Sequence, residues 1–242
     1  QELRVVEKTE RILEMLNKHN TKATFFVLGW IAERVPGLVS KIEQQGHEIA
    51  THGYSHTLLT KMSAQLFKED LEKALEVTSA CVDQPILGYR APSFTITNKT
   101  LWALEILAEH GIKYDSSIFP ISFHPDYGIP GAPLSIHQRS TLIEVPLSCV
   151  EILGRRIPCS GGGYFRIFPY LLSKMLMRQC NRQGRPVIFY FHPWEMDPGQ
   201  PRQKLPRMKT FRHYSNLDKT ESRLNQLLKD FSFVPIKKLL EL

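Results

Sequence analysis

The stretch Glu48-Ile49-Ala50-Thr51-His52-Gly53-Tyr54-Ser55-His56 runs from an apolar, strand-like segment into two histidines four residues apart. Two neutral imidazoles on one short segment can hold a divalent first-row cation, which generally takes one more carboxylate and keeps positions for water and substrate. The alternative is a pair of surface histidines, since the chain contains nine. The pair predicts half of a metal site where a strand ends.

Three further segments also begin with an apolar, strand-like run and end with polar or charged side chains. They contain Arg90 and Ser93 in Gly88–Phe94, Asp115 in Lys113–Ser117, and His192 in Phe189–Glu195. In a barrel of βα units the carboxyl ends of the strands meet on one face, where such enzymes keep their sites. A single histidine after a strand is usually a packed residue, but this shared location favours a functional site.

Together with the histidine pair, these segments resemble motifs two to five of the NodB-homology polysaccharide deacetylases, carbohydrate esterase family 4. The closest likeness is to a branch linked to exopolysaccharide loci, and it runs from about Arg4 to the C-terminus. It also includes Thr24–Trp30, Ser160–Arg166 and Phe211–Asp218. The resemblance implies an α/β fold, a distorted (β/α)7-type barrel of the NodB-homology kind, with one domain spanning residues 1–242.

The first motif of that family, a strand ending in an Asp pair or Asp-Val-Glu, has no match in the sequence. The chain opens at Gln1, inside the connection that follows this strand in the family. We therefore expect the first strand to be missing through truncation, with a degenerate family member as the alternative. Without the carboxylates of that motif, the chain is expected to be weakly active or inactive.

The resemblance assigns roles to the metal ligands and to the general acid. It implies that His52 and His56 hold a divalent metal, Zn²⁺ or alternatively Co²⁺ or Ni²⁺. The absent Asp of the first motif would deprotonate the water, and His192 would protonate the departing amine. Hydrolysis of an acetamide needs these three functions because amide resonance must be broken.

The resemblance also assigns supporting roles. It implies that Arg90 orients the base carboxylate and that the backbone N–H of Ser93 helps to hold the oxyanion. Asp115 resembles the acidic residue that raises the basicity of His192. Because Asp115 lies in Asp-Ser-Ser where the family more commonly has Asp-Trp, a loop-capping aspartate is the alternative.

Tyr164 and Trp194 are candidate substrate-binding residues. Sugar rings present C–H groups that stack on aromatic faces. Burial of these two rings in the core is the competing interpretation.

The leading hypothesis is metal-dependent hydrolysis of N-acetyl groups from N-acetylhexosamine units of a bacterial polysaccharide. One alternative is a metal-independent amidohydrolase of a small ureide or imide, because relatives with similar Arg-Ala-Pro-Ser and Asp-Ser-Ser patterns include such enzymes. The other is a degenerate, non-catalytic glycan-binding module.

Composition is consistent with one sizeable core in a chain of 242 residues with a net charge of +7. The charge could favour an anionic glycan, although lysines and arginines scattered over helices are more often a solvated surface. Nucleic acid is a poor candidate partner because no basic stripe with interleaved aromatic residues occurs. The longest apolar runs are strand-sized, so no transmembrane segment is predicted.

The four cysteines lack the spacing of a metal cluster. Cys149 and Cys159 flank a predicted hairpin that turns at Gly154-Arg155, so they could form a disulfide, with free buried thiols as the alternative.

Strand-like and helix-like segments alternate along the chain, as in a parallel sheet of βα units. We predict helices from near Arg4, from Pro36 to Gly46, and from Phe168-Pro169 to about Gln183, and a buried strand from Pro186 to His192. The alternation fails between Ile118 and Pro158, which predicts a long loop with a β-hairpin. Further expectations are an apolar stripe of Leu66, Leu71 and Leu75, a capping box over Asp218–Glu221, and a close backbone approach or a tight turn at Gly161–Gly163.

Overall fold

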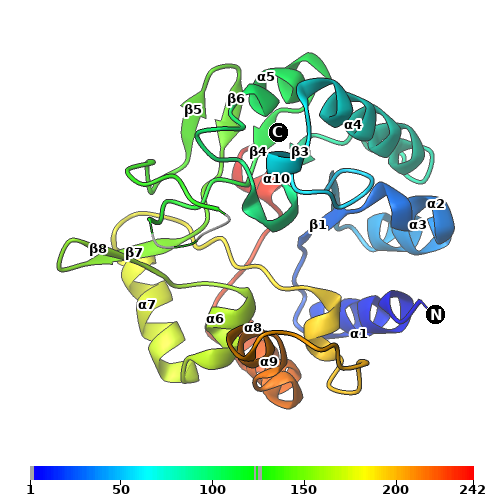
Figure 1. Cartoon of the computed structure of the whole chain (residues 1–242). Helices are drawn as coiled ribbons and strands as arrows, with labels where there is room; N and C mark the ends of the chain where they lie inside the picture. The colour runs from blue at the N-terminus through cyan, green and yellow to red at the C-terminus, as the bar shows by residue number, and fades with distance from the viewer. Residues whose placement is uncertain (1–2, 123, 125–126) are drawn as a thin grey trace. The chain divides into compact units, whose positions relative to one another are not determined.

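The computed structural model describes residues 3–122, 124 and 127–242. The chain divides into two compact units (Figure 1). The sheet unit consists of Lys22–Leu147 and Val234–Leu242, and the hairpin unit consists of Gln1–Thr21 and Ser148–Phe233. The organisation of residues 1–242 as a single domain stays a prediction.

The sheet unit is built on a six-stranded sheet with the order β1-β2-β3-β4-β6-β5. The strands β1 to β4 and β6 run parallel, and β5 is antiparallel at one end. Parallel neighbours require a crossover connection, which is usually a helix. The α/β class predicted from the alternating pattern is thus confirmed. The strands are β1 (Thr24–Val27), β2 (Glu48–Thr51), β3 (Gly88–Tyr89), β4 (Tyr114–Asp115), β5 (His137–Arg139) and β6 (Leu142–Glu144).

Helices of the sheet unit fill the crossovers between its strands. The predicted start at Pro36 is confirmed, since proline is favoured in the first turn of a helix, where its missing N–H costs nothing. The helices are α2 (Gly29–Arg34), α3 (Pro36–Gln44), η1 (Leu59–Lys61), α4 (Ala64–Ser79), η2 (Pro92–Phe94), α5 (Trp102–Glu109) and α10 (Ile236–Leu239).

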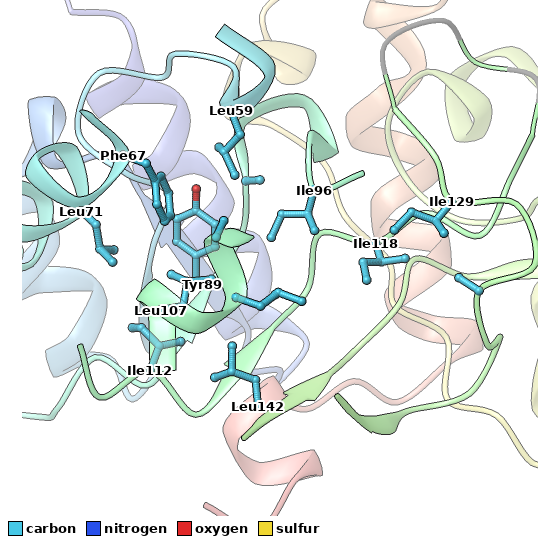
Figure 2. Close-up of a cluster of buried hydrophobic side chains, with 14 of the residues drawn as sticks. Leu59, Phe67, Leu71, Tyr89, Ile96, Leu107, Ile112, Ile118, Ile129 and Leu142 are labelled. Atoms are coloured by element: carbon cyan, nitrogen blue, oxygen red, sulfur yellow. The ribbon is translucent and has the colours of Figure 1, made fainter. Parts of the chain in front are cut away.

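The predicted apolar stripe on α4 is correct at Leu71, which is buried, and at Leu75, which packs against the core, but it is wrong at Leu66. Phe67 and Leu71 are buried, whereas Leu66 is 54% exposed. The large ring of Phe67 takes the inner position and packs edge-on against Tyr89, with ring centroids 5.7 Å apart. Figure 2 shows this cluster, in which Tyr89 comes from β3 and Phe67 from α4. Burying one such side chain contributes about 1.5–3 kcal/mol.

Glu48, the first residue of β2, attaches the end of the chain to the sheet. Its carboxylate accepts hydrogen bonds from the backbone N–H of Lys237 at 2.9 Å and from the hydroxyl of Tyr114 at 2.8 Å. The hydroxyl of Thr24 donates to the same carboxylate and accepts from the backbone N–H of Ile236 at 2.8 Å. These bonds satisfy N–H groups that every helix start leaves unpaired, here those of α10.

The hairpin unit combines helices with one two-stranded antiparallel hairpin. The helix from Arg4 is confirmed, and Pro169 caps the start of α7. The elements are α1 (Val5–Lys18), β7 (Cys149–Ile152), β8 (Arg155–Pro158), α6 (Gly162–Ile167), α7 (Tyr170–Arg182), η3 (Pro193–Met196), α8 (Arg207–Tyr214), η4 (Leu217–Lys219) and α9 (Thr220–Asp230).

The hairpin of β7 and β8 turns at Leu153 and Gly154, which have φ angles of 49° and 71°, and not at Gly154-Arg155. Cys149 therefore lies opposite Pro158 in the register. All four cysteines are free thiols, so the alternative of buried thiols is correct and the disulfide is not formed. A hydrogen bond from Cys159 lowers the pKa of Cys180 to about 7, which identifies Cys180 as a close neighbour of Cys159.

The segment 186–192 is extended but does not form the predicted strand. Its backbone groups bond to loop atoms: the N–H of Ile188 donates to Ser148 Oγ, and the carbonyl of Ile188 accepts from Ser160 Oγ. The carbonyl of Tyr190 accepts from the N–H of Gly162. A Cβ at Gly161 would lie 2.4 Å from that carbonyl oxygen, so the glycine run permits a close approach to the backbone of Tyr190 in the same chain; an approach to a ligand or to another chain stays a prediction.

The predicted capping box over Asp218–Glu221 is wrong. Lys219 is the N-cap of α9 and no side chain caps this helix. Asn216, with φ at 53°, is the N-cap of the short helix η4. Because η4 leads directly into α9, no side chain is in position to cap α9. None of the helices in the described part of the chain combines the length and the apolar character needed to cross a membrane.

Candidate active site

The histidine pair lies directly after β2, as the sequence predicts. The rings of His52 and His56 are 5.2 Å apart between centroids and meet edge to face. His52 Nδ1 is 2.6 Å from the carbonyl oxygen of Arg90. Since a carbonyl oxygen only accepts, Nδ1 carries the proton and Nε2 carries the lone pair. A hydrogen bond of this kind orients histidines that ligate metals.

A carboxylate from α4 shapes the turn between the two histidines. Asp70 accepts from the backbone N–H groups of Tyr54 at 2.8 Å and of Ser55 at 3.0 Å. Gly53 has φ at 73°, and a Cβ there would lie 2.8 Å from Asp70 Oδ2. Glycine therefore allows the close contact that fixes this turn. The sequence analysis missed Asp70, which lies 14 residues after His56 and outside the motif.

We predict that Asp70→Ala lowers the affinity of the protein for Zn²⁺ about 10- to 100-fold, because the turn carrying His56 loses its anchor. Glu69→Ala is the matched control, since Glu69 is an exposed neighbour on α4 that bonds only to Gln65 in this region. Competition with a chromophoric chelator measures both affinities. Equal affinity in Asp70→Ala and the unchanged protein would contradict the anchoring role.

Arg90 follows β3 and is 8% exposed. Its Nε donates to the carbonyl of Ser116 at 2.8 Å, and its Nη2 donates to Ser116 Oγ at 2.7 Å. The guanidinium also lies over the ring of Phe26, 4.1 Å from the centroid. These contacts fix the permanently charged guanidinium of Arg90, the residue whose backbone carbonyl orients His52.

The loop after Arg90 has an unusual backbone. Ser93, which is exposed, has φ at 52°, and Phe94 has φ at 56°. Left-handed conformations of non-glycine residues cost about 1–3 kcal/mol each and cluster at functional sites. The loop is supported where Ser117 Oγ accepts from the N–H of Ala91 at 2.7 Å.

Asp115, at the end of β4, is fully buried and supports this loop. It accepts from the hydroxyl of Ser117 at 2.5 Å and from the backbone N–H of Ser117 at 3.0 Å. It therefore has the contacts of the loop-capping aspartate that was the alternative to a role at His192. That catalytic role stays a prediction.

Glu144 is a second buried carboxyl group beside Asp115 that the sequence did not reveal. The two residues are partners in the register of β4 and β6. Burial raises the pKa of both groups, and for Glu144 the nearby Asp115 raises the pKa further, well above its ordinary value. Two adjacent buried carboxylates cannot both ionise cheaply, so burial and the charge of Asp115 both favour the protonated form of Glu144.

His192 is the N-cap of η3 in the hairpin unit. Its side chain is 47% exposed, and its Nδ1 lies 2.9 Å from Glu195 Oε1, which also accepts from the backbone N–H of His192. The other oxygen of Glu195 accepts from Arg166 Nε at 2.6 Å. Glu195 was missed by the sequence analysis, although a glutamate three residues after a cap position is the spacing of a capping box.

The two aromatic candidates also belong to the hairpin unit. Trp194 stacks on His213 with centroids 4.2 Å apart and planes at 13°, and the guanidinium of Arg166 lies 5.3 Å from the Trp194 centroid. Tyr164 is half-buried on α6, 6.2 Å from the ring of Phe168. Trp194 thus has packing partners of its own, and the role of both rings as sugar platforms stays a prediction.

Within the sheet unit the structure brings His52, Arg90 and Asp115 to the ends of three consecutive strands of the sheet. His192, by contrast, follows an extended segment that is not a strand. Among the described residues no group of three or more His, Cys, Asp or Glu side chains could hold a metal ion. A metal site built on the histidine pair would therefore also need water, substrate or another residue as ligands.

The comparison with protein families divides the chain into two parts. A model described as "Polysaccharide deacetylase" matches residues 4–114, and a model described as "Domain of unknown function (DUF3473)" matches residues 116–241. The chain belongs to the polysaccharide deacetylase family. It is a member of carbohydrate esterase family 4 whose second half is a DUF3473 region.

Curated relatives match part of this polysaccharide deacetylase family chain. The peptidoglycan-N-acetylglucosamine deacetylase of Bacillus cereus is 36% identical over 107 residues, which is 41% of this chain and 37% of that protein. The chain thus spans less than half the length of this relative.

Solved structures match over almost the whole chain. A putative polysaccharide deacetylase from Mycobacterium smegmatis has a TM-score of 0.60 at 21% identity, covering 99% of this chain and 76% of that one. A CE4 family pseudoenzyme from Bacillus anthracis has a TM-score of 0.55 at 15% identity, covering 98% of this chain and 61% of that one. These likenesses show the NodB-type deacetylase fold.

Proposed function

We propose that this polysaccharide deacetylase family member hydrolyses N-acetyl groups from N-acetylhexosamine units of a bacterial polysaccharide, with a divalent metal held by His52 and His56. The observation that carries the proposal is the orientation of His52. Its Nδ1–H is held by the carbonyl of Arg90, so Nε2 is the ligand atom beside the edge-on ring of His56.

The histidine pair fits a divalent metal in its donor chemistry. Imidazole nitrogen suits Zn²⁺, Co²⁺ and Ni²⁺, and a histidine whose other ring nitrogen donates to a carbonyl has the tautomer that ligation requires. A metal bound there would polarise the amide carbonyl and acidify a water molecule. Zn²⁺ is the first ion to test, with Co²⁺ and Ni²⁺ as alternatives.

The remaining roles belong to side chains of the protein. Arg90 holds His52 through its own carbonyl and supplies a fixed positive charge. Ser93 is exposed between buried neighbours and has a left-handed backbone conformation, which supports its assignment to the developing oxyanion. His192 supplies the proton for the departing amine, which would otherwise be a poor leaving group.

The relative from Bacillus cereus is named for peptidoglycan N-acetylglucosamine. This name supports N-acetylglucosamine as the first sugar to test. Tyr164 and Trp194 are the candidate stacking residues for its ring, as both expose part of an aromatic surface.

The metal assignment predicts that the double variant His52→Ala, His56→Ala loses stoichiometric Zn²⁺, Co²⁺ or Ni²⁺ after dialysis. Metal content by mass spectrometry and acetate release from an N-acetylglucosamine oligomer are measured together. His110→Ala is the control, because it removes a histidine of the same unit that bonds to Glu72. If the double variant keeps its metal, the assignment is wrong.

Metal-independent release of product from a ureide or imide would support the small-substrate alternative.

A further inference from the structure

We propose that Glu195, held in place by Arg166, is the positioning residue that fixes the tautomer and orientation of His192. This inference rests on the proposed function, because it concerns the residue assigned there as general acid. It names Glu195, and not Asp115, as the carboxylate partner of that histidine.

The first argument is the contact itself. Glu195 Oε1 lies 2.9 Å from His192 Nδ1 and accepts the backbone N–H of His192 at the same distance. One oxygen thus holds both the ring and the backbone of His192. An ionised carboxylate only accepts hydrogen bonds, so the proton of the neutral ring lies on Nδ1. The nitrogen left to exchange a proton with a substrate is Nε2.

The second argument is the charge of Glu195. Its side chain is 1% exposed, and burial alone would raise the pKa of the carboxyl group. The hydrogen bond and charge of His192, together with the charge of Arg166, outweigh burial and lower the pKa below the ordinary value. Glu195 therefore remains ionised at neutral pH and keeps its acceptor oxygens for His192 and Arg166.

The third argument is the rigidity of Arg166, which is 2% exposed. Its Nη1 donates to the carbonyls of His213 at 3.0 Å and Ser215 at 2.7 Å, and its Nη2 donates to the carbonyl of Arg212 at 3.0 Å. These carbonyls lie at the end of α8, where a positive charge is favourable. Since these carbonyls hold both Nη1 and Nη2, the guanidinium plane is fixed and Nε points toward Glu195 Oε2.

Asp115, in contrast, is engaged within the sheet unit. Ser117 donates to both of its oxygens, and the buried carboxyl group of Glu144 lies beside it in the register of β4 and β6. These contacts assign Asp115 to the support of the loop after Arg90.

The test uses Glu195→Gln in the full chain, a change that keeps size and shape. The buried, permanently charged Nε–H of Arg166 is the strongest donor at this position, so we expect the amide oxygen to turn to Arg166 and the amide NH₂ group to turn to His192, at the expense of the bond to the backbone N–H of His192. Nδ1 must then accept, which moves the proton of the neutral ring to Nε2. Heteronuclear NMR of ¹⁵N-labelled histidine reads this tautomer directly. We expect the Nδ1–H form in the unchanged protein and the Nε2–H form in Glu195→Gln.

Asp197→Asn is the matched control. Asp197 is also buried, lies two residues further along the same turn and pairs with Arg4 at 2.6 Å. This control should leave the Nδ1–H form unchanged. If Glu195→Gln unfolds, the double variant Arg166→Gln, Glu195→Gln replaces it, because it leaves no buried unpaired charge. Both tautomers should then be populated, since the amide no longer has a required orientation.

Activity gives the second readout. A wrong tautomer should lower kcat about 100-fold or more with little change in KM or in bound metal. Retention of the Nδ1–H form in Glu195→Gln, or an equal change in Asp197→Asn, would overturn the inference. If a longer protein that also carries the first motif of the family releases no acetate from any glycan, the proposed function fails, while the tautomer experiment still decides the role of Glu195.

Discussion

In a full-length enzyme that also carries the first motif, replacing His192 with alanine is expected to lower the rate of acetate release about 100- to 10,000-fold while bound metal stays unchanged. The amine leaves poorly unless it is protonated, and His192 is the group assigned to supply that proton. Its imidazole is half-exposed, as a residue that meets a large substrate must be. Turnover of an N-acetylated oligosaccharide and metal content are measured on the same samples.

His213→Gln is the control for this experiment. His213 stacks on Trp194 and bonds to Gln200, so its replacement changes the neighbouring packing without removing His192. Two outcomes would contradict the assignment of His192. Loss of metal in His192→Ala would make it a ligand, and normal turnover would remove the central step of the mechanism.

Arg166→Met is expected to reduce the free energy of unfolding by about 3–5 kcal/mol at neutral pH. The change leaves the carboxylate of Glu195 buried without its cation, and it also leaves three carbonyls at the end of α8 without a donor. Urea unfolding followed by fluorescence and circular dichroism measures the difference.

The effect should depend on pH in a defined direction. In the unchanged protein the pKa of Glu195 is lowered, so its ionised form stabilises the fold above the ordinary carboxyl range, and this contribution is lost as the pH falls through the lowered pKa. In Arg166→Met, burial is less opposed and the carboxyl group takes up a proton more readily. The difference in the free energy of unfolding between Arg166→Met and the unchanged protein should therefore become smaller from pH 7 to about pH 5.

Arg4→Met is the comparison for Arg166→Met. Arg4 also pairs with a buried carboxylate, that of Asp197, but the arginine side chain is 41% exposed. Its loss should cost about 1 kcal/mol or less, because water can replace much of the interaction. Equal destabilisation by the two changes, or a gap that widens at lower pH, would contradict the account of the buried pair.

Most of the parallel sheet was predictable because its strands leave a local signal, whereas β6 lies in the segment from Ile118 to Pro158 that was predicted as a long loop with a β-hairpin. The run before His52 is apolar and ends in polar residues, and the same change occurs at Arg90 and Asp115. Helix starts such as Pro36 were also predictable, since proline fixes its own backbone angle. The segment 186–192 has the same apolar signal but no neighbouring strand to pair with, and no local pattern reveals the absence of a partner.

The candidate site was predictable only where a motif carries the chemistry. The histidine pair and His192 are reactive residues in recognisable surroundings. Asp70 and Glu144 are ordinary acidic residues in helix or strand patterns, and their importance comes from contacts made in the folded chain. Arginine side chains are usually exposed to solvent, and nothing in the sequence marks Arg166 as different, yet it is among the largest fully buried side chains.

The contacts of Glu48 have a consequence for synthesis on the ribosome. A nascent chain that ends before Ile236 has already made β1 and β2, but Glu48 and Thr24 still lack the two N–H groups that the last helix donates. Because this loop spans about two hundred residues, the sheet unit can reach its full set of bonds only after Ile236 and Lys237 have left the ribosome.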